Sequence, residues 1–129
     1  MTDHILIERP ENAPGVLVIR LNRPDKKNAI TRAMYQAMTD ALKAADADDG
    51  VRATVFLGSE GCFSAGNDLN DFMAFAMGGT MGREVIDFLH ALAAHGKPLV
   101  SGVDGLAIGI GTTIHLHCDL TYASIRTEF

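Results

Sequence analysis

Tryptophan is absent from the 129-residue sequence, and cysteine occurs only twice. Cys62 and Cys118 lie in unrelated segments without C-x-x-C spacing, which argues against a zinc site and a disulfide framework, so reduced, buried thiols are expected. No apolar run approaches the ~18 residues that a membrane-spanning helix needs. Residues 1–4 lack the layout of a signal peptide. We therefore expect a cytoplasmic protein without a membrane partner.

Positive charge is also scarce. The chain has 11 Lys and Arg against 16 Asp and Glu, and its longest basic run is Lys26-Lys27. Phosphate contacts need clustered Lys and Arg, so nucleic acid is not expected as a partner. The composition, 47% hydrophobic and 21% charged, is that of a globular protein. A chain of this length can bury one core.

The apolar pattern predicts alternating strands and helices. Two β-rich runs at residues 4–9 and 16–21 predict a hairpin, and residues 51–57, 99–103 and 120–123 predict further strands. Thr31 is a candidate helix cap before apolar positions at helical spacing from Met34 to Ala45. A second amphipathic helix is expected around residues 85–93, ending at Gly96, and a third over residues 112–117. This order predicts an α/β class.

Glycines concentrate after the predicted strands, in two groups: Gly58, Gly61 and Gly66, then Gly102, Gly105, Gly109 and Gly111. Such turns can aim successive backbone N–H groups at one anion, or they can simply be tight turns. Ile114 stands where a dinucleotide fingerprint needs its third glycine, and no P-loop motif occurs. Ser64 and Ser101 lack the flanking glycines of a nucleophile elbow. Nucleotide binding and serine hydrolysis are therefore disfavoured.

Three segments in order resemble the crotonase (enoyl-CoA hydratase/isomerase) family. They are L-N-R-P with N-A-I at residues 21–30, F-S-A-G-N-D-L at residues 63–69, and the stretch from Lys97-Pro98 through Gly111 to C-D-L-T-Y-A at residues 118–123. The resemblance covers essentially the whole chain. It implies a crotonase-like ββα spiral, with residues 1–129 forming a single partial domain, the amino-terminal half of an acyl-CoA-binding domain.

The resemblance also implies an oxyanion hole. Matched residue by residue, its two backbone donors are the amides of Asn67 and Ile110, which would bind the thioester oxygen of an acyl-CoA and stabilise an enolate. The coenzyme A contacts carried over in the same way are Lys27, Ala29, Ser64, Ala65, Gly66, Asp68, Leu69 and Gly109. Lys27, Lys26 and Arg23 form a compact positive patch that suits an anionic ligand. The alternative is a solvated loop without a ligand.

Departures from the family pattern bear on the reaction. Thr113 stands where hydratases of the family carry one of two glutamates, which favours isomerisation of a 3-enoyl-CoA to a 2-enoyl-CoA through a single carboxylate. Enoyl-CoA hydration in fatty-acid β-oxidation is the close alternative. A non-catalytic acyl-CoA-binding or assembly protein is an alternative of another class, and a protease on the same spiral architecture is a remote one.

Further expectations follow from the resemblance. The catalytic glutamate is expected beyond Phe129, and the full-length protein is expected to form a homotrimer or hexamer. No separate cofactor is expected, since coenzyme A is part of the substrate. Met73, Met77 and Met81, near Phe72 and Phe75, are an acyl-chain wall or an apolar cap, and we favour the wall. The His115, His117, Cys118 and Asp119 group is not expected to bind metal, because residues two apart on a helix point to different faces.

Overall fold

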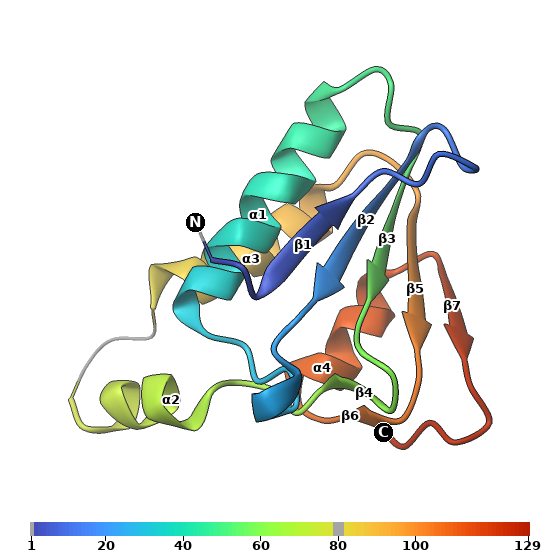
Figure 1. The fold of residues 1–129 in the computed structure, drawn as a ribbon. Helices are drawn as coiled ribbons and strands as arrows, with labels where there is room; N and C mark the ends of the chain where they lie inside the picture. Colours follow the sequence, from blue (N-terminus) through green and yellow to red (C-terminus); the bar gives the residue numbers. More distant parts are fainter. Residues whose placement is uncertain (1, 79–81) are drawn as a thin grey trace.

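A five-stranded sheet forms the centre of the fold in the computed structural model, which describes residues 2–78 and 82–129 (Figure 1). Its strands are β1 (Ile5–Glu8), β2 (Val16–Leu21), β3 (Ala53–Leu57), β5 (Leu99–Val103) and β7 (Leu120–Ala123), in the order β1-β2-β3-β5-β7. β1 and β2 pair antiparallel, as the predicted hairpin requires, and the remaining neighbours pair parallel. The α/β class is confirmed.

Two long helices pack together and contribute to the main core with the sheet. α1 (Arg32–Ala47) begins where predicted, because the Thr31 hydroxyl accepts the Met34 N–H at 3.2 Å. α3 (Arg83–Ala94) inserts Phe88, whose ring meets those of Tyr35 and Phe56 at centroid distances of 5.4 and 6.3 Å. Leu17, Ile19 and Leu21 of β2 are buried in the same cluster. The helices are therefore fixed on the sheet by apolar burial, which is the main source of helix stability in proteins.

A smaller parallel sheet lies beside the large one and carries the glycine-rich turns. β4 (Cys62–Ser64) pairs with β6 (Leu106–Ala107), and each strand leads through a turn into a helix, α2 (Leu69–Ala76) and α4 (Ile110–Thr113) respectively. The third predicted helix begins earlier in the sequence than the expected residue 112. Helical structure starts at Ile110 and tightens into the 3₁₀-helix η2 (Ile114–His117).

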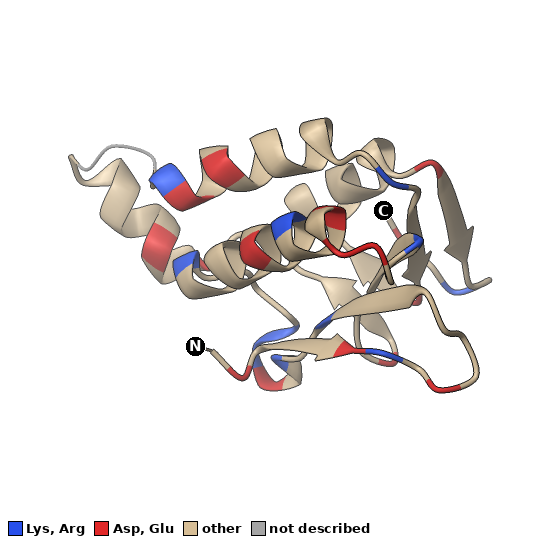
Figure 2. Ribbon diagram, turned by 90° about the horizontal axis from the view of Figure 1, so that it is seen from above, with Lys and Arg blue, Asp and Glu red and all other residues tan. Residues whose placement is uncertain are grey.

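Charge is mixed on the outer helices: blue and red residues alternate along α1 in Figure 2. The prediction of buried thiols was only half right, because Cys62 and Cys118 are free but half-buried. Burial still raises the pKa of both thiols. Over residues 2–78 and 82–129, no helix has both the length and the apolar character needed to cross a membrane.

Candidate functional site

Two turns in equivalent positions form the core of the site. In the β4–β6 ladder Ser64 lies opposite Ala107, and the Ile108 N–H donates to the Ser64 carbonyl at 3.0 Å. Asn67 lies three residues after Ser64, and Ile110 lies three residues after Ala107. The two predicted donors therefore occupy matching places after paired strands.

A glycine precedes each donor, and the two glycines touch. Gly66 has φ +96° and Gly109 has φ +60°, conformations that side-chain-bearing residues rarely adopt. A Cβ built on Gly109 would lie 4.0 Å from the Gly66 Cα, and one built on Gly66 would lie only 2.9 Å from the Ile108 carbonyl oxygen. A side chain at Gly66 would push the turns apart, whereas at Gly109 the added Cβ has room and only the positive φ favours glycine.

The backbone N–H of Asn67 points away from the neighbouring segment at Ile30. Ile30 donates to the Gly66 carbonyl at 2.8 Å and accepts from the Asp68 N–H at 3.0 Å, which leaves the amide of Asn67 on the opposite edge. Within the part of the chain that the structure describes, this N–H donates to no protein acceptor.

Ile110 offers a second such group. It is the first residue of α4, where a helix has no acceptor for its N–H. The next three amides turn inward, to the carbonyls of Ile108 and Gly109 at 2.9 to 3.1 Å, whereas no acceptor among the described residues takes the Ile110 N–H. Two unpaired backbone donors thus follow two touching glycines, an arrangement that can bind one negatively charged oxygen.

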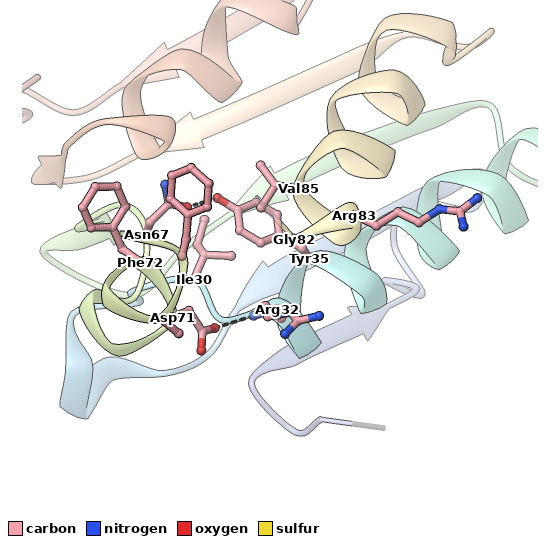
Figure 3. A pocket seen from close by; sticks show the side chains of 11 residues that line it. Ile30, Arg32, Tyr35, Asn67, Asp71, Phe72, Gly82, Arg83 and Val85 are labelled. Carbon is pink, nitrogen blue, oxygen red and sulfur yellow. Dashed lines mark hydrogen bonds between the residues drawn. The ribbon is translucent and has the colours of Figure 1, made fainter. Parts of the chain in front are cut away.

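A cavity of about 550 Å³ opens beside Asn67 (Figure 3). Its lining comes from α1, α2, the start of α3 and the segments before them: Ile30, Arg32, Tyr35, Asn67, Asp71, Phe72, Ala74, Phe75, Gly82, Arg83 and Val85. Ile110 does not line it, so the cavity reaches one of the two donors. The aromatic and aliphatic wall could accommodate an apolar group.

The methionines predicted as an acyl-chain wall do not line this cavity. Met73 of α2 and Met77, which follows α2, are 56% and 82% exposed, and Met81 lies outside the described residues. Phe72 and Phe75 supply the apolar wall from that helix instead. The structure therefore does not place Met73 and Met77 in a wall of this cavity.

Ser64 is engaged inside the protein. It is fully buried, and its hydroxyl donates to the Asn28 carbonyl at 2.9 Å and accepts from the Gly66 N–H at 3.0 Å. Asp68, in the same signature, is 8% exposed and caps α2 by accepting from the amides of Asn70 and Asp71. Both side chains therefore hold the first turn in place.

The ion pair between Asp68 and Arg23 corrects the predicted positive patch. The Arg23 guanidinium lies 2.8 Å from the Asp68 carboxylate, and both side chains are largely buried. This hydrogen bond, helped by the capping amides, holds the pKa of Asp68 below its usual range. Arg23 is thus neutralised within the fold, and Lys26 and Lys27 remain as the exposed cations of the loop.

The loop that carries Lys27 and Ala29 is pinned to the first signature. The Lys27 carbonyl accepts from the Ala65 N–H at 2.9 Å, and the Ala29 carbonyl accepts from Arg23 at 3.1 Å. Leu69 is 76% exposed at the start of α2. The residues expected to contact coenzyme A therefore come from adjoining segments, although they are far apart in sequence.

Asn28 is a structural residue that the sequence reasoning missed. It is fully buried with φ +55°, and its side-chain amide donates to Ser59 Oγ and to the carbonyls of Cys62 and Phe63, each at 3.1 Å. Asparagine tolerates this left-handed conformation better than most residues. Asn28 belongs to the N-A-I segment of the family resemblance, but that segment did not indicate a buried, structural role for its side chain.

The His115 side chain is occupied in the core. Its Nδ1 lies 2.7 Å from the hydroxyl of Ser101, which lies 2.8 Å from that of Thr121. Burial lowers the pKa of His115. His117, by contrast, is exposed. Among residues 2–78 and 82–129, no three His, Cys, Asp or Glu side chains gather as a potential metal site.

The paired turns on a two-stranded parallel sheet, beside a mixed sheet covered by helices, define the crotonase-type ββα fold. The chain belongs to the enoyl-CoA hydratase/isomerase family, whose model matches residues 11–129. It is 44% identical to enoyl-CoA delta isomerase 2 of Rattus norvegicus, over 89% of this chain and 30% of that protein. It is 32% identical to 2,3-dehydroadipyl-CoA hydratase of Escherichia coli, over 88% of this chain and 45% of that protein.

A solved structure supports the same assignment. OdaA of Pseudomonas aeruginosa superposes with a TM-score of 0.86 at 43% identity, over 95% of this chain and 48% of OdaA. The chain thus spans between about a third and a half of the length of these relatives. The fold it contains corresponds to the amino-terminal portion of the family's domain.

Proposed function

We propose that this chain binds the thioester carbonyl of an acyl-CoA between the backbone amides of Asn67 and Ile110. Loss of a proton from carbon two of a thioester builds negative charge on the carbonyl oxygen, and preorganised N–H donors stabilise that charge. The observation that carries the proposal is the pair of touching glycine turns, which leave both amides without a protein acceptor in the described part of the chain.

Coenzyme A would bind as part of the substrate along the loop and the first signature. The proposed contacts are Lys27, Ala29, Ser64, Ala65, Gly66, Asp68, Leu69 and Gly109. Because the side chains of Ser64 and Asp68 are engaged internally, their contacts would come from the backbone. Lys26 and Lys27 supply exposed positive charge on an otherwise acidic protein. This charge would suit the phosphates of coenzyme A.

The reaction we propose is isomerisation of a 3-enoyl-CoA to a 2-enoyl-CoA. Moving a proton between two carbons needs one carboxylate, whereas hydration uses two, and Thr113 stands at the position of one of them. The 44% identity to a delta isomerase supports this choice. Hydration stays the second candidate, because a hydratase is also similar along most of the chain.

The base is proposed to lie outside residues 1–129. Asp71 lines the cavity, but its carboxylate accepts the backbone N–H of Arg32 at 2.8 Å. The Asp119 carboxylate accepts the backbone N–H of Leu99 at 2.9 Å. Asp68 is held by Arg23. Assembly of the full-length protein as a trimer or hexamer is part of the same proposal and rests on the family resemblance.

Absorbance separates the candidate functions. The complete protein is incubated with a 3-enoyl-CoA and, separately, with a 2-enoyl-CoA, and the conjugated enoyl-thioester band is followed. An isomerase increases this band from the 3-enoyl substrate, whereas a hydratase decreases it from the 2-enoyl substrate. Calorimetric binding of the acyl-CoA with neither change would identify a non-catalytic binder and refute the proposed reaction.

A further inference from the structure

A buried tyrosine hydroxyl reaches Asn67. Tyr35, in the first turn of α1, is 1% exposed, and its hydroxyl donates to Oδ1 of Asn67, as the dashed line in Figure 3 shows. The tyrosine ring packs against Phe88 of α3 at a centroid distance of 5.4 Å. Core packing therefore fixes the ring, while its hydroxyl lies at the wall of the cavity.

The peptide group that carries the Asn67 N–H is tethered on one side only. Its carbonyl, that of Gly66, accepts from Ile30 at 2.8 Å, and a trans peptide directs its N–H the opposite way. Gly66 has no side chain to restrict rotation of this peptide. This peptide is therefore held at its carbonyl, while its N–H has no partner among the described residues.

The bond from Tyr35 supplies a second tether, at the side chain of Asn67. Burial raises the pKa of Tyr35, so the hydroxyl stays protonated and remains a donor at neutral pH. Once Oδ1 accepts this bond, the side-chain torsion of Asn67 is set by a group anchored in the core. The first turn of α1 is thereby connected to the amide that is proposed to bind the thioester oxygen.

We propose that Tyr35 is a positioning residue, which holds the Asn67 amide in its donor orientation through the Asn67 side chain. The inference rests on the proposed function and adds to it a residue that does not itself touch the thioester. It predicts that Tyr35 contributes to polarisation of the carbonyl and to turnover, but little to binding of the coenzyme A portion.

The test measures the carbonyl stretch of a bound acyl-CoA labelled with ¹³C at the thioester carbon, by infrared difference spectroscopy on the complete protein. Binding to the wild type is expected to shift this band to lower frequency. Tyr35→Phe should reduce the shift and lower kcat about fivefold, the equivalent of one net hydrogen bond of ~1 kcal/mol. KM should change less than about twofold, because only the orientation of one donor is lost.

Asn67→Ala breaks the same bond from its exposed end while keeping the backbone N–H, so the test stands even if Tyr35→Phe does not fold. If Tyr35 acts through Asn67, adding Tyr35→Phe to Asn67→Ala should cause no further loss. Tyr122→Phe is the matched control. Tyr122 is 65% exposed on β7 and lies outside the cavity, so its replacement should leave shift and kcat unchanged.

The outcomes separate the two proposals. A wild-type protein that binds the acyl-CoA without a carbonyl shift would refute the oxyanion assignment, and the role of Tyr35 with it. A normal wild-type shift that Tyr35→Phe and Asn67→Ala leave intact would overturn the positioning role alone. Equal losses from Tyr35→Phe in the wild-type and Asn67→Ala backgrounds would show that Tyr35 acts by packing, which also overturns it.

Discussion

Replacing Gly66 with alanine is expected to damage both the fold and the site. The new Cβ would lie 2.9 Å from the Ile108 carbonyl oxygen, and the residue would have to keep φ +96°. A left-handed conformation costs a non-glycine residue ~1–2 kcal/mol, and overpacking against backbone adds ~1–3 kcal/mol. The alanine also lowers the entropy of the unfolded chain, which offsets ~0.4–1 kcal/mol. We expect a net loss of ~2–4 kcal/mol in the free energy of unfolding.

Gly61 provides the matched control for this substitution. It has a similar conformation, φ +78°, but its added Cβ would meet nothing closer than the Arg126 side chain at 4.0 Å. Gly61→Ala should therefore cost only the backbone strain, ~1 kcal/mol after the entropic offset. The difference between the two variants isolates the contact between the turns.

The assays are urea unfolding and the infrared shift of a bound acyl-CoA, both on the complete protein. Relief of the clash must separate the Gly66 and Ile108 backbones, whereas oxyanion donors act within roughly 2.7–3.1 Å of the oxygen. Gly66→Ala should accordingly lose most of the carbonyl shift and Gly61→Ala should keep it. Equal stability losses together with an intact shift in Gly66→Ala would refute the argument that glycine contact builds the site.

Four further predictions concern single side chains, one backbone donor and the isolated chain. Ile110→Pro removes one donor at the first position of α4, where helices tolerate proline, and should lower kcat roughly a hundred- to a thousandfold. The fold should persist by circular dichroism, with a stability loss limited to the packing of the Ile110 side chain against the core. Asp68→Asn keeps the cap but loses the ion pair. The pKa of Asp68 is lowered in the folded state, so the stability from its charged form is fully present above about pH 4 and is lost as pH falls through the folded-state pKa. The deficit of Asp68→Asn in the free energy of urea unfolding should therefore be full above about pH 4 and disappear at lower pH. Asp68→Ala should cost ~1 kcal/mol more than Asp68→Asn, and a smaller gap would contradict the capping role. The 129-residue chain alone should bind acyl-CoA but isomerise a 3-enoyl-CoA only slightly above the solution rate; turnover comparable with that of the rat enoyl-CoA delta isomerase 2 would refute a base outside the chain.

The sequence predicted the parts of the fold that local rules control. α1 begins at its capping threonine and buries Met34 and Met38, as their spacing required. The strands of the large sheet were found because they are runs of apolar and β-branched residues. β6 was missed, since two residues carry no periodic signal, and the turn from α4 into a 3₁₀-helix depends on tertiary packing.

The candidate site was likewise predicted only in part from the sequence. Gly66 and Gly109 stood out in the sequence because they fall in recognisable family signatures. The bonds of Tyr35 to Asn67 and of Arg23 to Asp68 join residues 32 and 45 positions apart. The sequence around these residues contains no pattern that predicts the bonds. Such contacts follow from how the elements pack, which a single sequence does not reveal. The ion pair that removes Arg23 from the predicted positive patch could not be foreseen for this reason.

A site made of backbone amides places unusual demands on a sequence. The donor function needs glycine before it and an N–H at residues 67 and 110, but it does not specify which side chains those residues carry, and here they are Asn and Ile. Side chains at and around the donors are then free to differ between relatives that share the turns. Because isomerases and hydratases are both similar to this chain, the choice between their reactions should depend on such neighbours. In this chain Thr113, three residues after the donor Ile110, is the neighbour on which the choice between the two reactions is expected to depend.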